Sequence, residues 1–213
     1  MHWVNRGAEP NAIAAVRSQY TQAWLDHYQH GVGNRPTPRW RQFRGDLRGV
    51  FSELCGYCEE ETTGEIEHFR PVSKFPSLVY EWSNWVFACP TCNREKSSKW
   101  PLGGYVDPCA GEESERPERF FTFHTGTGEM MPKSELSDSQ EKRARQTIGD
   151  INLNASYHLK RRRRLLIDLK YHLDRQSDDS DDEEYLSEKV DRASALSSLA
   201  RALLEERGFI IED

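Results

Sequence analysis

Four cysteines stand in two C-x-x-C pairs, a spacing that suits metal binding better than disulfide bonding. These are Cys55, Cys58, Cys89 and Cys92. Thiolates are soft ligands, and four of them in a tetrahedron bind Zn²⁺. Because a closed shell leaves no position for a substrate or a water, we expect a structural zinc ion that stabilises a small fold. The fifth cysteine, Cys109, has no motif around it, and we expect a partly buried structural thiol.

Glu67 and His68 are neighbours in the stretch "EIEHF", which lies between the two cysteine pairs. A neutral imidazole can take a proton from water at pH 7, and a carboxylate is a ligand for a hard divalent cation. Hydrolysis of a phosphodiester bond needs both a base and a bound positive charge. Adjacent residues of a strand point to opposite faces, so we expect the twist of the chain to bring both side chains to one cleft. The alternative is a buried histidine bonded to the backbone.

The surrounding residues predict the order strand, loop, strand and helix. Alternation over residues 65–69 predicts a strand, and the apolar run at residues 85–88 predicts its partner. Pro90 favours the first turn of a helix, which we expect to continue to about Lys99. A zinc ion would then hold the start of the hairpin against the start of this helix. Asn93 lies on the first turns of the helix, where it can face the first strand.

Longer helices are predicted on both sides of this region. The predicted helices cover residues 10–30, 39–54, 139–153, 156–176 and 184–207, and a hairpin is predicted over residues 119–130. We therefore predict an α+β fold, in which a mainly helical chain surrounds a small zinc-stapled motif. Three segments are expected: an N-terminal helical extension (1–50), the motif itself (51–101), and a C-terminal hairpin and helical region (102–213).

The chain has 213 residues, of which 30% are charged, and a formal net charge of -6. It has no apolar run long enough to cross a membrane and no secretion signal pattern, so we expect a cytoplasmic protein with reduced cysteines. The net charge hides a basic segment, "KRRRR" (160–164), and an acidic one, "DDSDDEE" (178–184). The basic segment could bind nucleic acid, pair with the acidic segment or contact a partner protein, and the sequence leaves all three open.

The pattern C-x-x-C … I-E-H-F-x-P … N-W-x-x-x-C-x-x-C-N-x-x-K resembles the zinc-containing HNH endonucleases, whose site is a ββα-metal fold. The resemblance implies that His68 is the general base and that Asn84 steadies the loop and the base. It also implies that Glu67 and Asn93 bind the catalytic cation, Mg²⁺ or Mn²⁺. Glu67 stands where the family has aspartate, and Asn93 stands where the last histidine falls. Both departures keep an oxygen donor for a hard cation.

Four basic residues beside this motif could contact phosphates, although each could equally be a solvated surface charge. They are Arg70, Arg94, Lys96 and Lys99.

Over most of its length the chain also resembles the small HNH subunit of Septu-type anti-phage systems, including those attached to retrons. The matching stretches include "VNRGAEPNAI" and "EKRARQTIGDINLN". This resemblance implies an endonuclease that cleaves nucleic acid, with DNA favoured over RNA, and that is gated by an ATPase partner. The alternative is a non-catalytic zinc-stapled module that binds nucleic acid or protein.

Overall fold

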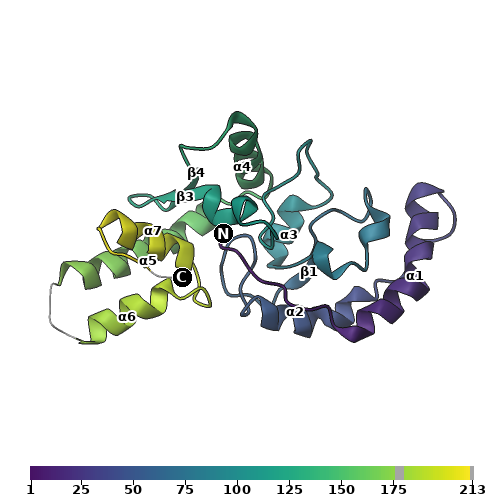
Figure 1. The fold of residues 1–213 in the computed structure, drawn as a ribbon, viewed down its shortest axis with the longest axis horizontal. Coiled ribbons are helices and arrows are strands. Elements are labelled where there is room, and N and C mark those ends of the chain that lie inside the picture. The colour runs from purple at the N-terminus through teal and green to yellow at the C-terminus, as the bar shows by residue number, and fades with distance from the viewer. Residues whose placement is uncertain (176–179, 212–213) are drawn as a thin grey trace.

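The computed structural model of the chain describes residues 1–175 and 180–211. Two small antiparallel sheets, each of two strands, are surrounded by helices, so the predicted α+β fold is confirmed (Figure 1). The strands are β1 (Glu65–His68), β2 (Trp85–Ala88), β3 (Phe121–His124) and β4 (Glu129–Pro132). The α-helices are α1 (Asn11–Gln29), α2 (Arg44–Val50), α3 (Pro90–Lys96), α4 (Asp138–Asp150), α5 (Ser156–Asp174), α6 (Ser180–Val190) and α7 (Ser197–Glu206). Short 3-10 helices cover Trp40–Phe43, Pro76–Leu78, Trp82–Asn84, Glu113–Glu115 and Pro117–Arg119.

The motif has the predicted order, with β1 and β2 forming a hairpin and α3 following directly. His68 pairs with Trp85 across the hairpin. Pro90 begins α3, where a missing backbone N–H costs nothing, and the sulfur of Cys89 caps the helix by accepting the N–H of Cys92 at 3.3 Å. The helix ends at Lys96, three residues earlier than predicted, because Ser97 leaves the helical conformation with φ 49.

The C-terminal helices differ from the prediction in two respects. The single helix predicted over residues 184–207 is wrong, because the chain bends between α6 and α7 and Leu196 adopts a left-handed conformation with φ 60. The acidic segment predicted as a loop at 178–184 is helical from residue 180, since acidic side chains in a first turn complement the helix dipole. Residues 178 and 179 lie outside the described part of the chain.

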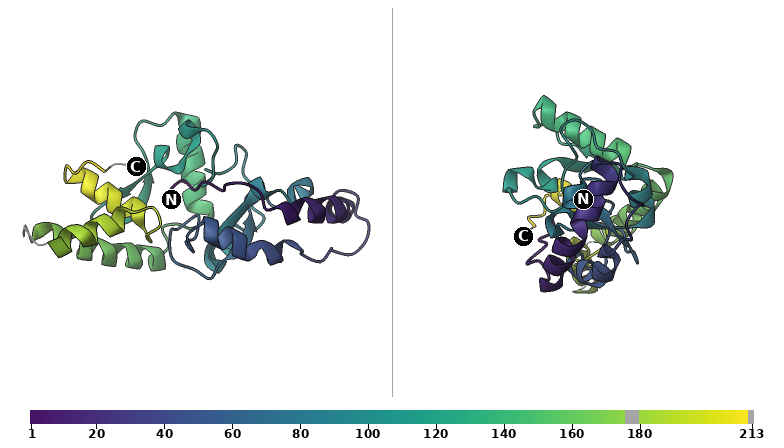
Figure 2. Two further views of the ribbon diagram at one scale, coloured as in Figure 1. Left: turned by 60° about the horizontal axis from the view of Figure 1, so that its bottom comes forward. Right: turned by 90° about the vertical axis from the view of Figure 1, so that its right-hand side faces the viewer.

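The helices α5, α6 and α7 pack together at one end of the molecule, and α1 extends at the opposite end (Figures 1 and 2). The buried apolar cluster nevertheless includes residues from all three predicted segments, such as Trp24, Phe87 and Leu166. The division at residues 50 and 101 therefore stays a prediction. Within the described residues, no helix is long and apolar enough to cross a membrane.

Gly64, just before β1, occupies a position that no larger residue fits. It has φ +44, and a Cβ there would lie 2.2 Å from the ring of Phe87. We expect Gly64→Ala to lower the free energy of unfolding by about 3 kcal/mol, combining left-handed strain with overpacking. Gly149→Ala in α4 is the control, because its Cβ would meet nothing within 4 Å and should stabilise the helix by up to about 1 kcal/mol. Equal effects of the two changes in denaturant unfolding would contradict this account.

Candidate active site

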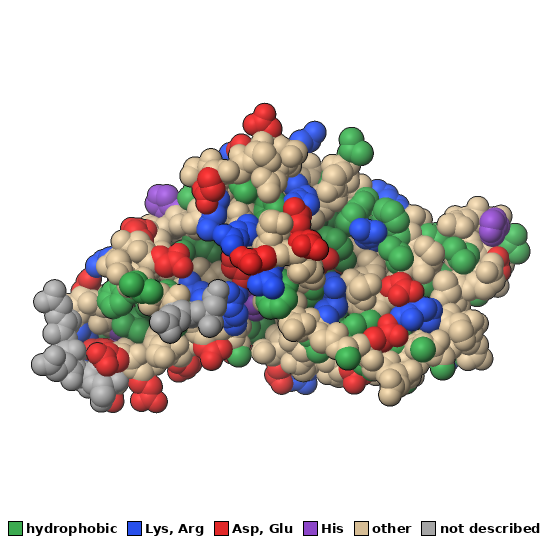
Figure 3. All heavy atoms as spheres, viewed as in Figure 1, with side chains coloured by type: hydrophobic (Ala, Val, Ile, Leu, Met, Phe, Trp, Pro, Cys, Tyr) green, Lys and Arg blue, Asp and Glu red, His purple; other side chains and the backbone are tan. Residues whose placement is uncertain are grey.

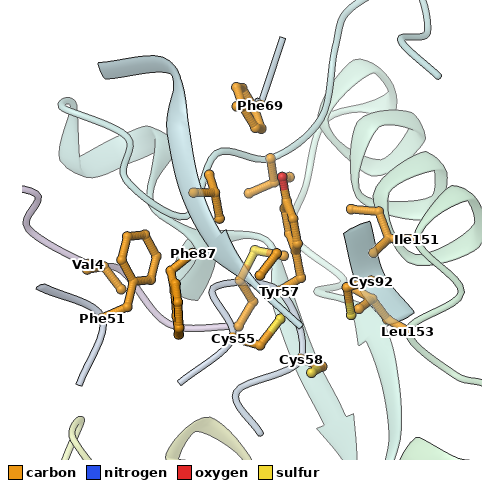
Figure 4. Close-up of a cluster of buried hydrophobic side chains, with 14 of the residues drawn as sticks. Val4, Phe51, Cys55, Tyr57, Cys58, Phe69, Phe87, Cys92, Ile151 and Leu153 are labelled. Carbon is orange, nitrogen blue, oxygen red and sulfur yellow. The ribbon is translucent and has the colours of Figure 1, made fainter. Parts of the chain in front are cut away.

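The four predicted metal ligands converge. The sulfurs of Cys55, Cys58, Cys89 and Cys92 all lie within 4.8 Å of one another. A tetrahedral zinc ion with Zn–S bonds of about 2.3 Å holds its sulfurs about 3.8 Å apart. The sulfurs of Cys58 and Cys89 are 3.9 Å apart, so the cluster fits a zinc ion. Buried apolar and aromatic side chains, Tyr57, Ile151 and Leu153 among them, surround the cysteines (Figure 4).

His158, which no motif in the sequence singles out, joins α5 to this cluster. His158 Nε2 lies 4.0 Å from the sulfur of Cys92, and its Nδ1 lies 2.6 Å from a carboxylate oxygen of Glu60. Glu60 also forms an ion pair with Arg161. The ring of His158 is buried, and the side chains of Cys58, Glu60 and His158 converge as well. The start of α5 is therefore fixed against the cysteine cluster.

The cysteine cluster should bind zinc and determine whether the motif folds. We expect Cys58→Ser to lose most of the bound zinc and much of the helical circular dichroism, since structural zinc contributes directly to folding. Cys109→Ser is the control because Cys109 lies outside the cluster. It should keep the zinc content of the unmodified protein. A folded Cys58→Ser variant with full zinc content, measured by elemental analysis, would rule out this role.

Glu67 is buried and both of its carboxylate oxygens are engaged. The hydroxyl of Tyr57 donates to Oε2 at 2.5 Å, and Nζ of Lys96 donates to Oε1 at 2.5 Å. Tyr57 lies within the first cysteine pair and Lys96 lies on the helix that carries the second, so each pair supplies one donor. Burial raises the pKa of Glu67, and Lys96 opposes the shift. Burial and the nearby Glu67 hold the pKa of Tyr57 well above its ordinary value, so the phenol stays a donor.

His68 lies on the opposite face of β1. Its Nε2 contacts the carbonyl oxygen of Val79 at 2.8 Å, and because a carbonyl only accepts, Nε2 must carry the proton and Nδ1 the lone pair. The indole N–H of Trp85 donates to the same carbonyl at 3.0 Å. The imidazole packs edge-on against Trp40, 4.6 Å between ring centroids, and the residue is 8% exposed. Burial lowers the pKa of His68 to about 4, so it is neutral at pH 7.

Asn84 closes the loop between the two strands. Its Oδ1 accepts the backbone N–H of Arg70 at 2.8 Å, and its Nδ2 donates to the carbonyls of Arg70 and Leu78, each at 3.1 Å. These bonds hold both ends of the loop that supplies the Val79 carbonyl. Asn84 thus holds the loop whose Val79 carbonyl accepts the hydrogen bond of His68.

Asn93 contacts a carboxylate, but not that of Glu67. Its Nδ2 donates to Oε2 of Glu65 at 2.7 Å. Glu65 and Glu67 are two residues apart and therefore share the face of β1 that meets α3. This spacing was the signal in the sequence that could have selected Glu65.

The structure does not bring the side chains of Glu67 and His68 to one cleft, because Glu67 faces Tyr57 and Lys96 whereas His68 faces Trp40. Glu67 and Asn93 offer oxygen donors of the right kind for a hard cation. As they are arranged, however, they do not fit one, because both oxygens of Glu67 are occupied by internal donors.

The four basic residues predicted to contact phosphates differ in exposure. Arg70 and Arg94 are exposed, whereas Lys96 is fully buried and cannot reach a phosphate in this arrangement. Lys99 is exposed, and its Nζ donates to the carbonyl of Asp150 at 2.9 Å. On the face drawn in Figure 3, basic side chains are interspersed with acidic ones. Arg70 and Arg94 are therefore the two best placed to meet a phosphate.

Residues 55–99 match the family model described as HNH endonuclease, so the hairpin, α3 and the cysteine cluster belong to the part of the chain that this class defines. The predicted resemblance is confirmed for this region. The chain is also similar to the Septu protein PtuB of Bacillus thuringiensis, at 27% identity over 100 residues. That alignment covers 45% of this chain and 37% of the relative, so the chain matches well under half of the relative's length.

Losing one partner of the ion pair between Lys96 and Glu67 should destabilise the fold more than losing both. We expect Lys96→Met to cost about 3–5 kcal/mol of unfolding free energy, because it leaves a buried carboxylate without its cation. Adding Glu67→Gln should recover most of that loss. Arg48→Met, which breaks the exposed pair with Glu53, is the control and should cost about 1 kcal/mol or less. Denaturant unfolding of the zinc-loaded variants measures all of these, and additive losses in the double variant would contradict the coupling.

Proposed function

We propose that the chain is a metal-dependent HNH endonuclease that hydrolyses phosphodiester bonds in nucleic acid, with DNA favoured over RNA. We further propose that it is the nuclease of a cytoplasmic Septu-type or retron-associated anti-phage complex, in which an ATPase subunit gates it. The observation that carries the proposal is a neutral His68, fixed in one tautomer, within the region that matches the HNH family model. The Septu protein among its relatives supports the defence role.

In this proposal each residue of the motif has one task. His68 accepts a proton from the attacking water at Nδ1, while Val79 and Asn84 keep the ring in place. Arg70 and Arg94 contact the phosphate chain. Glu67 and Asn93 would hold Mg²⁺ or Mn²⁺, which would offset the negative charge that develops on the phosphate.

These tasks require a more open arrangement of the same residues. Glu67 would have to release the ammonium of Lys96 before binding a cation, and the cover that Trp40 forms over His68 would have to move. Catalytic contacts are often incomplete until substrate binds, so a closed site is compatible with an enzyme. A closed site is also what gating by a partner subunit requires, because an ungated nuclease would attack the DNA of its own cell.

The alternative function is a non-catalytic zinc-stapled module that binds nucleic acid or protein. The burial of His68 and the ion pair of Glu67 favour it, since both side chains have structural partners that account for them. Removing the imidazole of His68 distinguishes the two functions, because only the endonuclease would need it for cleavage.

His68→Asn tests the proposal. We expect a folded, zinc-loaded protein whose cleavage of plasmid DNA or RNA with Mg²⁺ or Mn²⁺ falls by a factor of 10² or more, since a general base contributes about 10²–10⁴. The assay is run with and without the ATPase subunit, and His30→Asn on an exposed histidine is the control. Full cleavage by His68→Asn would remove His68 as the base. An intact complex that binds nucleic acid but never cuts it would favour the alternative.

A further inference from the structure

Three of the five basic residues at 160–164 serve the fold. Arg161 forms an ion pair with Glu60 beside the cysteine cluster. Arg162 is buried and its NH1 contacts the carbonyl of Gly128 at 3.3 Å. Arg163 donates to the carbonyl of Thr127 at 3.1 Å. These three arginines hold α5 against the cysteine cluster and the β3–β4 hairpin, so they are not available as a group for a ligand.

Lys160 and Arg164 are different. Both are exposed, and neither makes a hydrogen bond or ion pair with any residue that the structure describes. They lie one turn apart, about 6 Å along the helix, on the side opposite buried His158 and Leu166. Tyr157, 38% exposed, precedes Lys160 by one turn on the same side. This side of the first half of α5 thus presents two unpaired cations and one phenol to solvent.

The acidic start of α6 does not neutralise these cations. Asp182 contacts Nδ1 of His172 at 2.5 Å and Nε of Arg175 at 3.5 Å. Both partners lie at the far end of α5, about two to three turns beyond Arg164. Among the described residues, the acidic start of α6 therefore pairs with the far end of α5 and not with Lys160 or Arg164.

The position of this surface relates it to the candidate site. His158 fixes the start of α5 against Cys92, and Asn93 and Arg94 follow Cys92 on α3. Arg94 is also exposed and makes no hydrogen bond or ion pair with the described parts of the chain, residues 1–175 and 180–211. The unpaired cations of α3 and of α5 therefore lie on two helices that meet at the cysteine cluster.

We propose that Tyr157, Lys160 and Arg164 bind the phosphate backbone of the nucleic-acid substrate, extending the contacts that Arg94 makes next to the candidate site. The inference rests on the proposed function. It assigns to this surface the contacts with the substrate that lie at a distance from the cleaved bond. Charge complementarity selects the occupant: exposed cations that no ion pair neutralises gain from releasing the counterions of a polyanion, and a tyrosine hydroxyl can donate to a phosphate oxygen. Such contacts position a nucleic acid without reading its bases.

The test measures binding without cleavage. The zinc-loaded full chain is titrated, with no added divalent cation, against fluorescent 30-base-pair DNA over a range of NaCl concentrations. We expect Lys160→Ala/Arg164→Ala to bind about tenfold to a hundredfold more weakly at 0.1 M salt. The slope of log K against log salt should become shallower by about 1.8, since each phosphate contact contributes about 0.9. Lys142→Ala/Arg145→Ala on exposed α4 positions removes the same charge and should leave the slope unchanged.

Each other outcome has a definite meaning. An unchanged slope in the α5 double variant overturns the inference, and if that variant also fails to bind the ATPase subunit, the surface contacts a protein instead. If Arg94→Ala makes the slope of log K against log salt shallower and the α5 double variant does not, the phosphate contacts are confined to α3 and the inference fails. Normal salt-dependent binding together with no cleavage by the assembled complex would sink the proposed endonuclease while leaving this surface intact. Circular dichroism and zinc content confirm that the variants compared are folded.

Discussion

Four thiolates gathered within 4.8 Å of one another repel unless a cation shares their charge, and the candidate site depends on that requirement. Two of the cysteines precede β1, one lies just before α3 and one lies within it, so an ion bound by all four would fix the hairpin to the helix. The same arrangement delivers Tyr57 and Lys96 to the two oxygens of Glu67. His158 extends the connection to α5. The small motif at residues 55–99 thus gains rigidity that its own apolar core would not supply.

In the fold, the buried carboxylate of Glu67 is paired with Lys96, whereas the proposed function would pair it with a divalent cation. Moving an ionised carboxylate out of water is costly, and an internal ammonium with a phenol offsets much of that cost. A cation from solution would have to compete with a partner that the chain itself provides. The ion pair therefore stabilises the closed arrangement, and binding of a cation by Glu67 would first require the release of Lys96.

The sequence predicted the backbone of the motif better than its side-chain contacts. Alternation at residues 65–69 and Pro90 are local signals, and both elements formed where these signals lay. The partners of Glu67, by contrast, come from residues ten and twenty-nine positions away, and no periodicity records such contacts. The bend before α7 was missed for a related reason. Leu196 adopts its left-handed conformation within an apolar pattern that contains no glycine or proline, and tertiary packing decides it.

The carbonyl of Val79, which accepts both from His68 and from Trp85, has a consequence for the chemistry of the imidazole. Because Nε2 is committed to this hydrogen bond, Nδ1 is the nitrogen left to exchange a proton. Its affinity for that proton is low because the ring is dry. Contact of the His68 ring with water would bring its pKa back towards about 6.5. In the proposed mechanism, admitting the attacking water would therefore also make the imidazole a stronger base.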